Sequence, residues 1–361
     1  MNATSSPDSA RMIRVLLVDD SSLTLEILRR MLATAGDIEV VACASNGLEA
    51  LKMALQIRPD VICTDFHLPG MDGLSLTREL MSQYPVPILV MSTSLQDGQK
   101  DNIFALLEAG AVEVLAKPLG GNQVDFGTMA QDLIRKIRIL SGVKVFKRRT
   151  QSTANQAAAA PAPGRLIAPT QHPRIIGIGA STGGPQALEA ILRSLPRSFP
   201  LPLICIQHIA NGFMQGLVNW LAGCCQIRIC SAQAGMAPEP GTAYFAIDGR
   251  HLEIGQDGRF RCSALLPVGG HRPSIDLALR SLARQYGAGA AGVLLTGMGH
   301  DGAQGLLEIS SAGGFTIAQD EQSSIVFGMP KAAIDSGAAR AVLPLPEIAG
   351  ALLRLSARRI P

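Results

Sequence analysis

Hydrophobic positions in the first 143 residues alternate between short apolar runs and longer amphipathic segments. Five runs of five or six mostly apolar residues are each followed by a segment whose apolar residues recur every three or four positions. Short strands that alternate with helices in this way are typical of a doubly wound parallel sheet. We therefore expect a five-stranded, flavodoxin-like α/β domain, with strands at 13–18, 38–42, 60–64, 87–92 and 112–116, and helices at 21–36, 47–58, 73–83, about 103–110 and 126–140.

A change in composition separates this block from the rest of the chain. Residues 144–173 are rich in alanine, proline, glutamine and threonine and carry few large apolar side chains. Such a segment buries too little surface to fold and acts as a flexible tether. We predict a first domain over 12–143, a linker over 144–173 and a second domain over 174–361.

The second block repeats the pattern of apolar runs. RIIGIG, LPLICIQ and AAGVLLTG, which end at residues 179, 207 and 297, each read as a buried strand followed by polar residues. They predict a second α/β domain with a mainly parallel sheet. TAYFAI (242–247) and RHLEI (250–254) flank an Asp248-Gly249 turn, so we expect these two runs to pair as a β-hairpin.

Composition narrows the classes of function. A net charge of +3 in 361 residues is too mild for a nucleic-acid surface, so no nucleic-acid partner is expected. No signal-peptide pattern opens the chain and no apolar stretch is long enough to cross a bilayer, so we expect a cytoplasmic protein without membrane insertion. Its seven cysteines show no zinc-ligand spacing, and the adjacent Cys224 and Cys225 are poorly placed for an unstrained disulfide.

Charged and hydroxyl side chains follow four strands of the first block. Asp19 and Asp20 follow the first strand, Asp65 the third, Ser92 closes the fourth and Lys117 follows the fifth. The carboxyl ends of these strands form the functional edge of a doubly wound sheet. Carboxylates gathered there repel one another unless a hard cation such as Mg²⁺ binds between them, and one could then attack a phosphoryl donor. For Asp20 alone, capping of the next helix is an alternative.

Three residues with catalytic potential follow the strands of the second block. Ser181 lies in the glycine-rich turn GASTGG, His208 follows the second strand, and Asp301 lies in TGMGHDGAQG after the third. If the strands are parallel neighbours, the three side chains share one edge of the sheet. A histidine can then take the serine proton while an aspartate orients the imidazole. This spacing predicts a serine hydrolase.

Other residues compete for these roles. His251, His271 and His300 are alternative bases, and the alternative acids are Asp248, Asp276 and Asp320. The glycines before Ser181 also fit a weak dinucleotide-binding pattern, but the next strand ends in Gln207 rather than in an acidic residue for a ribose hydroxyl. A nucleotide site is therefore not expected.

The first block resembles the receiver domain of two-component response regulators, on its strand-end aspartates and the stretch DFHLPGMDG from Asp65. The resemblance implies that Asp65 is the phosphoacceptor and that a histidine kinase supplies the phosphoryl group. It also implies that Mg²⁺ is bound by Asp20, Asp65 and the carbonyl of His67, with Asp19 assisting through water.

The same resemblance gives expected roles to the remaining strand-end residues. Lys117 would contact the phosphoryl group, and Ser92 would be the hydroxyl that moves toward it. Val114 stands where receivers often carry an aromatic residue, so a switch by ring rotation is not expected.

The second block is similar to the catalytic domain of the CheB family of protein-glutamate methylesterases. The stretches that carry the similarity are GASTGGPQAL, QHIANGF, RHLEI, GGHRPSIDLALRSLA, LLTGMGHDGAQGL and TIAQDEQSSIVFGMPKAAIDSGA. The similarity implies a triad of Ser181, His208 and Asp301, with no metal required in this block. It implies hydrolysis of glutamate γ-methyl esters on chemoreceptors and deamidation of receptor glutamines.

Four further residues are expected near the substrate. Thr182 and Met298 lie in the glycine-rich turns, whose backbone amides could hold an oxyanion, and His271 and Arg272 open the HRPSID stretch. Two other functions stay open: a phosphorylation-controlled receptor-binding protein without turnover, and a serine esterase for small metabolites.

Overall fold

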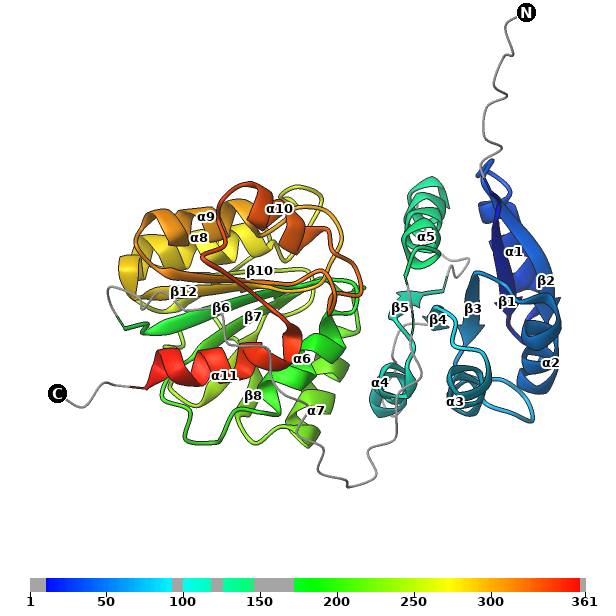
Figure 1. Ribbon diagram of the computed structural model, residues 1–361, viewed down its shortest axis with the longest axis horizontal. Coiled ribbons are helices and arrows are strands. Elements are labelled where there is room, and N and C mark those ends of the chain that lie inside the picture. The colour runs from blue at the N-terminus through cyan, green and yellow to red at the C-terminus, as the bar shows by residue number, and fades with distance from the viewer. Residues whose placement is uncertain (1–10, 93–99, 118–125, 144, 146–171, 358–361) are drawn as a thin grey trace, which may run out of the picture. The chain divides into compact units, whose positions relative to one another are not determined.

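The computed structural model describes residues 11–92, 100–117, 126–143, 145 and 172–357 (Figure 1). These residues form two compact units, each built around its own parallel sheet. The predicted linker, residues 144–173, lies almost entirely outside the described residues, and its boundaries stay a prediction.

The first unit contains the predicted five-stranded sheet. Its strands run in the order β2-β1-β3-β4-β5 and all pair in parallel. The strands are β1 Ile13–Val18, β2 Ile38–Ala44, β3 Val61–Asp65, β4 Ile88–Ser92 and β5 Glu113–Ala116. The helices are α1 Ser22–Leu32, α2 Gly47–Ile57, α3 Gly73–Gln83, α4 Lys100–Ala109 and α5 Phe126–Leu140. The doubly wound architecture expected for this block is confirmed.

Burial explains why these strands read as continuous apolar runs. Every residue of β3 and β4 is buried, because helices cover both faces of the sheet. Figure 1 shows α1 and α5 on one face and α2 and α3 on the other, and each pair is in contact. Polar residues on these central strands are therefore confined to the carboxyl ends, where Asp65 and Ser92 stand.

The second unit has a seven-stranded parallel sheet in the order β14-β13-β12-β6-β7-β9-β8. Its strands are β6 Ile175–Ala180, β7 Leu203–Gln207, β8 Arg228–Ser231, β9 Thr242–Phe245, β12 Ala290–Leu294, β13 Phe315–Gln319 and β14 Ala341–Leu343. The three strands predicted to be parallel neighbours, β12, β6 and β7, are adjacent. The mainly parallel sheet is thus confirmed.

Helices cover both faces of this sheet as well (Figure 1). One layer contains α8 Ile275–Tyr286, α9 Ala303–Ser311 and α10 Met329–Asp335; the other contains α6 Gly184–Leu192, α7 Met214–Cys224 and α11 Leu345–Ser356. A short 3-10 turn, η1 Gly287–Gly289, leads into β12. The most extensive helix pairing of the described chain joins α8 and α9, the two helices that flank the segment containing Asp301.

The predicted hairpin is placed wrongly. The strand β9, from TAYFAI, is fully buried and joins the large sheet between β7 and β8, whereas β10 His251–Ile254 pairs antiparallel with β11 Phe260–Ser263. Five residues separate β9 from β10, more than a two-residue turn needs, and uninterrupted burial favours a sheet interior over a hairpin. Asp248 instead accepts the backbone N–H groups of Gly212 and Met214 at the start of α7, and burial raises its pKa.

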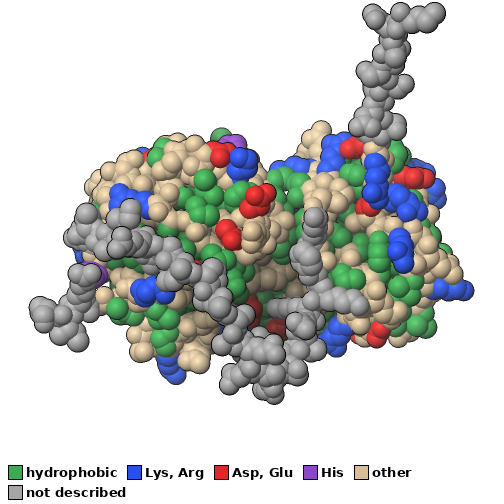
Figure 2. All heavy atoms as spheres, in the orientation of Figure 1, with side chains coloured by type: hydrophobic (Ala, Val, Ile, Leu, Met, Phe, Trp, Pro, Cys, Tyr) green, Lys and Arg blue, Asp and Glu red, His purple; other side chains and the backbone are tan. Residues whose placement is uncertain are grey.

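Charge on the molecular surface is mixed. In Figure 2, lysine and arginine side chains on the visible face lie among acidic and apolar ones. Within the described residues, no helix combines the length and hydropathy needed to cross a bilayer.

Candidate functional site

The carboxyl edge of the first sheet gathers three carboxylates. Asp19 and Asp20 follow β1, and Asp65 ends β3, the neighbouring strand. One carboxylate oxygen of each lies within 4.8 Å of the others. Asp19 and Asp65 are buried and Asp20 is exposed, so the cluster opens to solvent on one side.

Lys117 bridges two of these carboxylates. Its Nζ lies 2.7 Å from Asp19 Oδ2 and 2.7 Å from Asp65 Oδ2, and its side chain is only 8% exposed. Burial alone would lower the pKa of Lys117, but the two ion pairs outweigh it and raise the pKa. For Asp65 the balance is reversed: burial raises the pKa of its carboxyl, and Lys117 only partly offsets this effect. The cluster is therefore short of positive charge.

This donor set fits a divalent cation. With all groups ionised, three carboxylates and one ammonium leave an excess of two negative charges, and carboxylate oxygen is the ligand that Mg²⁺ prefers. Asp20 is free for this role because Ser21, not Asp20, is the N-cap of α1: the Ser21 hydroxyl accepts the backbone N–H of Thr24 at 3.3 Å. The capping alternative for Asp20 is wrong.

Three further residues of this unit were singled out from the sequence. Ser92 ends β4 and is buried, and its backbone carbonyl accepts the N–H of Lys117 at 2.7 Å. The His67 ring is exposed and packs edge-on against Phe66, with ring centroids 4.7 Å apart. Val114 is buried in β5, so no aromatic ring stands at that position.

In the second unit, sheet register brings Ser181 and His208 side by side. Ala180 and Gln207 are paired residues at the ends of β6 and β7, and the next residue on each strand is a candidate. The backbone N–H of His208 donates to the Ala180 carbonyl at 3.0 Å, which continues the ladder across this edge. Neighbouring strands are about 4.8 Å apart, so serine and histidine stand on adjacent strands at one edge of the sheet although 27 positions separate them in sequence.

His208 is oriented by Asp301. Its Nε2 lies 2.9 Å from Asp301 Oδ2, and both side chains are largely buried. The other ring nitrogen, Nδ1, is buried and has no hydrogen-bond partner within the described part of the chain. With Asp301 ionised, Nε2 carries the ring proton and donates a hydrogen bond to the carboxylate, which leaves the lone pair of Nδ1 available. A histidine in this state can accept a proton.

Asp301 is held by three more donors. The Ser274 hydroxyl and the Asp276 N–H donate to Oδ1, each at 3.0 Å, and the Ile275 N–H donates to Oδ2 at 2.8 Å. Burial would raise the pKa of Asp301, but the hydrogen bonds and the charge of His208 lower it to about 2. The carboxylate therefore stays ionised at neutral pH and keeps its place beside His208.

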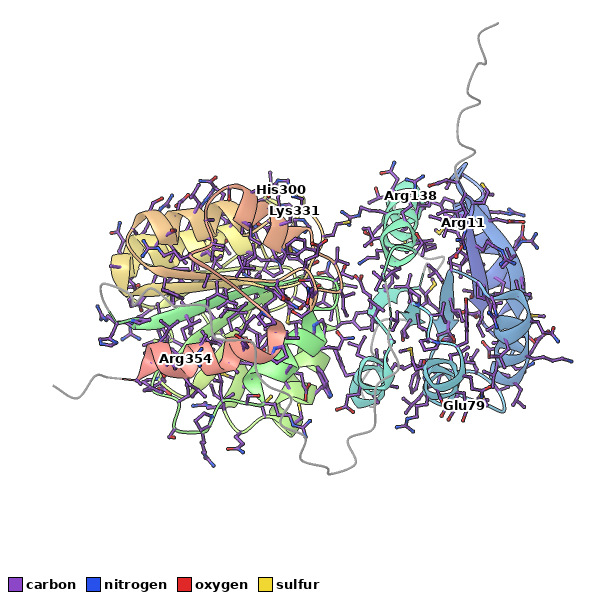
Figure 3. The ribbon with its side chains drawn as sticks, viewed as in Figure 1. Arg11, Glu79, Arg138, His300, Lys331 and Arg354 are labelled. Carbon is purple, nitrogen blue, oxygen red and sulfur yellow. The ribbon has the colours of Figure 1, made fainter. Side chains whose placement is uncertain are left out.

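The other candidate histidines are differently placed. The ring of His271 stacks on that of His208, with centroids 4.0 Å apart and planes within 3°. His251 is fully buried with both ring nitrogens engaged: Nδ1 accepts the N–H of Ser274, so Nε2 donates to the Leu266 carbonyl. His300 is exposed at the outer surface of the unit (Figure 3). His208 has the contact with Asp301 that a general base needs.

The rival acids have other partners. Asp248 binds the start of α7, as described above, and Asp320 accepts the N–H and the hydroxyl of Ser323. Asp276 accepts the N–H groups of Gly302 and Gly305. None of these contacts involves a histidine.

Two positioning residues escaped the sequence-based prediction. The Gln207 amide donates through Nε2 to the carbonyls of both Ser181 and His208, at 2.8 and 2.7 Å, and so ties the two turns together. The Thr296 carbonyl accepts the Ser181 N–H at 3.0 Å, and the Thr296 hydroxyl donates to the Thr182 carbonyl at 3.0 Å. A buried polar side chain at the end of an apolar strand was the available signal for Gln207.

Close backbone approach sets the shape of the serine turn. Gly183 has a φ of 74°, a conformation that favours glycine, and it caps α6 just after Ser181. A Cβ on Gly297 would lie 2.7 Å from Ser181 Cβ and 2.4 Å from Met329 Sδ. The segment after β12 can therefore pack against Ser181 only with glycine at this position.

The predicted oxyanion and substrate residues lie around this turn. Thr182 is buried between Ser181 and Gly183 at the start of α6, where the positive end of the helix dipole favours negative charge. Met298 follows Gly297 and is half-buried. Arg272 donates through Nη1 to the carbonyls of Ala264 and Leu265, so this contact fixes a neighbouring loop. Their roles stay predictions.

Comparisons with known proteins assign each unit to a family. Residues 15–125 match the response regulator receiver domain family, and residues 176–352 match the CheB methylesterase family. A protein-glutamate methylesterase/protein-glutamine glutaminase of Nitrosospira multiformis is 41% identical over 352 residues, which cover 96% of this chain and 98% of that one. One from Myxococcus xanthus is 39% identical, with 94% and 96% covered.

Among solved structures, the CheB methylesterase catalytic domain of Thermotoga maritima is 36% identical, with a TM-score of 0.49. The match covers 51% of this chain and 98% of that one. Identity near 40% over almost the full length of curated relatives, with both domains in the same order, places this protein among them. The chain belongs to the CheB family of receiver-linked protein-glutamate methylesterases.

Proposed function

We propose that this protein is a phosphorylation-activated hydrolase of chemotaxis-type signalling. It removes methyl groups from glutamate γ-methyl esters of chemoreceptors and deamidates receptor glutamines to glutamates. The observation that carries the proposal is the state of His208: Nε2 is committed to Asp301, while Nδ1 is unpartnered within the described chain and lies at the sheet edge that presents Ser181.

In this mechanism Nδ1 of His208 is the general base. It takes the proton from Ser181 Oγ as the oxygen attacks the carbonyl carbon of the ester, and Asp301 stabilises the imidazolium that forms. The Ser181 hydroxyl makes no hydrogen bond within the described residues, so it is available to the base. Backbone amides at the start of α6 and near Met298 stabilise the oxyanion.

Collapse of the tetrahedral adduct breaks the bond to the methoxy group, which leaves as methanol with the proton from His208. Water then attacks the acyl-serine, His208 takes a proton from that water, and the proton returns to Ser181 as the glutamate carboxylate is released. With glutamine as substrate the same steps release ammonia in place of methanol.

In the receiver unit, the proposed phosphoacceptor is Asp65. Burial raises the pKa of Asp65, which means that its negative charge is destabilised. That charge is reduced when one carboxylate oxygen forms a bond to a phosphoryl group. Lys117, now paired with Asp65, turns to the new phosphoryl oxygens, and Ser92 donates to them from β4. Mg²⁺ held by Asp19, Asp20 and Asp65 would neutralise phosphoryl charge.

The partners follow from this chemistry. A histidine kinase supplies the phosphoryl group, and the methylated cytoplasmic helices of chemoreceptors are the substrate. We place the protein in the cytoplasm, where its seven thiols stay reduced: none of them forms a disulfide, and the Sγ atoms of Cys224 and Cys225 lie 3.9 Å apart.

A methanol-release assay on methylated receptor cytoplasmic domains, read in parallel by mass spectrometry of the receptor, tests the proposal. Wild type should release methanol and convert glutamine to glutamate, and Ser181→Ala should lose turnover by roughly three orders of magnitude or more. Ser194→Ala, at an exposed serine on the turn after α6, is the matched control and should keep full activity.

Three outcomes separate the alternatives. Receptor binding without methanol release by wild type would identify a binding protein without turnover. Rapid hydrolysis of small esters with the receptor left methylated would identify a metabolite esterase. Full activity of Ser181→Ala would refute the serine mechanism.

A further inference from the structure

Asp301 and Asp276 cap each other's helices. Asp301 lies just before α9, yet its carboxylate accepts the N–H groups of Ile275 and Asp276 at the start of α8. Asp276 lies in the first turn of α8, yet its Oδ1 accepts the N–H groups of Gly302 and Gly305, at 3.0 and 2.7 Å, at the start of α9. Each carboxylate thus binds free amides at the other helix's positive end.

The reciprocal bonds leave the Asp301 backbone little freedom. Gly302, the next residue, has a φ of 96° and packs so closely that a Cβ there would lie 2.6 Å from side-chain atoms of both Ile275 and Leu294. The Gly302 N–H is one of the two amides that the Asp276 carboxylate binds. A shift of Gly302 moves Asp301, because the two residues share a peptide bond.

The surroundings of Asp276 disfavour its ionised form. Burial raises the pKa of its carboxyl; the Gly305 N–H opposes this, and the nearby Asp301 carboxylate adds to it. Repulsion between the Asp276 and Asp301 carboxylates destabilises the fold, and the hydrogen bonds from the α9 amides to Asp276 must offset this repulsion. α9 has no side-chain N-cap of its own, since Gly302 occupies that position.

We infer that Asp276 is a positioning residue of the esterase reaction. It fixes the start of α9 so that Asp301 Oδ2 stays at hydrogen-bond distance from His208 Nε2. Among the described residues, Asp276 makes no hydrogen bond to His208 or Ser181; its N–H binds Asp301, and its Oδ1 binds Gly302 and Gly305. The role of Asp301 in this inference rests on the proposed function.

The chain offers a variant that keeps the geometry and one that removes it. Both α9 amides bind Oδ1, and the side-chain oxygen of asparagine can accept both bonds, so Asp276→Asn keeps the cap and loses only the charge. Asp276→Ala loses both bonds. Ser281→Ala is the control for general destabilisation of α8, because the buried Ser281 hydroxyl bonds the Ile254 N–H and the Ala278 carbonyl, far along the helix from Asp301.

Two readouts test the inference in the full chain with a methylated receptor domain. In Asp276→Ala, kcat should fall about tenfold to a hundredfold with KM within about twofold of wild type. A misplaced catalytic group stabilises the transition state less but changes the affinity for the substrate little. Asp276→Asn should stay within roughly threefold of wild type. Ser281→Ala should lose thermal stability without this loss of kcat.

The second readout does not depend on turnover. The ring proton on His208 Nε2, which the Asp301 bond shields from exchange with water, should give a low-field NMR signal in wild type, Asp276→Asn and Ser281→Ala. It should broaden or vanish in Asp276→Ala. A sharp signal together with unchanged kcat in Asp276→Ala would overturn the inference. If wild type showed the signal but no turnover, the proposed function would fail while the positioning of Asp301 stood or fell on the NMR result alone.

Discussion

Asp65 and Asp301 are both buried aspartates at the carboxyl edge of a parallel sheet, but different groups surround them. Asp65 accepts one backbone N–H, from Phe66, and shares a lysine with Asp19. Asp301 accepts two backbone N–H groups, a serine hydroxyl and an imidazole N–H. Burial pushes the pKa of both upward, yet the pKa of Asp65 is raised and that of Asp301 falls to about 2.

The hydrogen-bond donors around a buried carboxylate, rather than burial itself, decide what that carboxylate can do. A carboxylate short of donors benefits from a bond to an electrophile or a cation, which suits a phosphoacceptor. A carboxylate surrounded by donors gains nothing from reacting and instead orients its neighbour. In their proposed roles, the two aspartates serve opposite purposes at the carboxyl edge of their sheets.

The largest effect is expected from removal of the proposed phosphoacceptor carboxylate. Asp65→Asn should abolish phosphorylation and with it any increase in turnover that a small-molecule phosphodonor causes. Chelation of Mg²⁺ with EDTA should have the same effect on wild type, because the three carboxylates then repel both one another and the donor. Intact-mass measurement of phosphorylation and methanol release are the readouts.

Two outcomes would contradict the proposed roles of Asp65 and of the metal. If Asp65→Asn still gained a phosphoryl group, Asp65 would not be the acceptor. If EDTA abolished Ser181-dependent turnover without a phosphodonor, the metal would belong to the esterase reaction instead.

Removal of the orienting carboxylate should cost turnover rather than phosphorylation. In Asp301→Asn, His208 loses the anion that stabilises its protonated form and fixes its tautomer, so kcat should fall by roughly three to four orders of magnitude. Phosphorylation of Asp65 should proceed as in wild type. Asp320→Asn, at an aspartate that bonds Ser323, is the matched control. Equal kcat for Asp301→Asn and wild type would exclude Asp301 from the triad.

A smaller effect should follow from crowding the serine turn. In Gly297→Ala the new Cβ would collide with Ser181 Cβ and Met329 Sδ, so we expect kcat to fall about tenfold to a hundredfold and the unit to lose about 1–3 kcal/mol of stability. Gly223→Ala, on α7 with no atom near the added Cβ, should be neutral or slightly stabilising. Steady-state kinetics and thermal unfolding of both variants measure the contrast, and equal behaviour would contradict it.

The smallest expected effect is on stability at acid pH. The folded pKa of Asp301, about 2, lies below the unfolded value of about 3.9, so its ionised form stabilises the fold above pH 4. That contribution, about 2 kcal/mol, should be lost as pH falls from about 4 to about 2.

Urea unfolding followed through Trp220, the single tryptophan of the chain and a residue of α7, measures this loss in the second unit. Asp301→Asn should remove that part of the pH dependence. An unchanged slope between pH 4 and 2 would show that Asp301 is not held by the donors described here.

Hydrophobic periodicity was sufficient to predict most of the fold. The five strands of the first unit and the three strands that carry Ser181, His208 and the Asp301 segment form where the apolar runs occur, because a strand covered on both faces must be apolar throughout. Pairing was harder to predict: TAYFAI was assigned to a hairpin, yet β9 lies inside the parallel sheet. Local turn signals at Asp248-Gly249 say nothing about which distant strand a run will join.

The side chains at strand ends can be read from the residue pattern, because apolar runs mark the strands and the next polar residue is visible in the sequence: Ser181, His208, Asp65 and Lys117. What those side chains bind depends on tertiary contacts. Asp301 lies seven residues beyond the end of β12, and only the packing of α8 against α9 brings Ser274, Ile275 and Asp276 to its carboxylate. Strand ends follow from local pattern, whereas the donors around a buried carboxylate come from distant segments whose meeting depends on the whole fold.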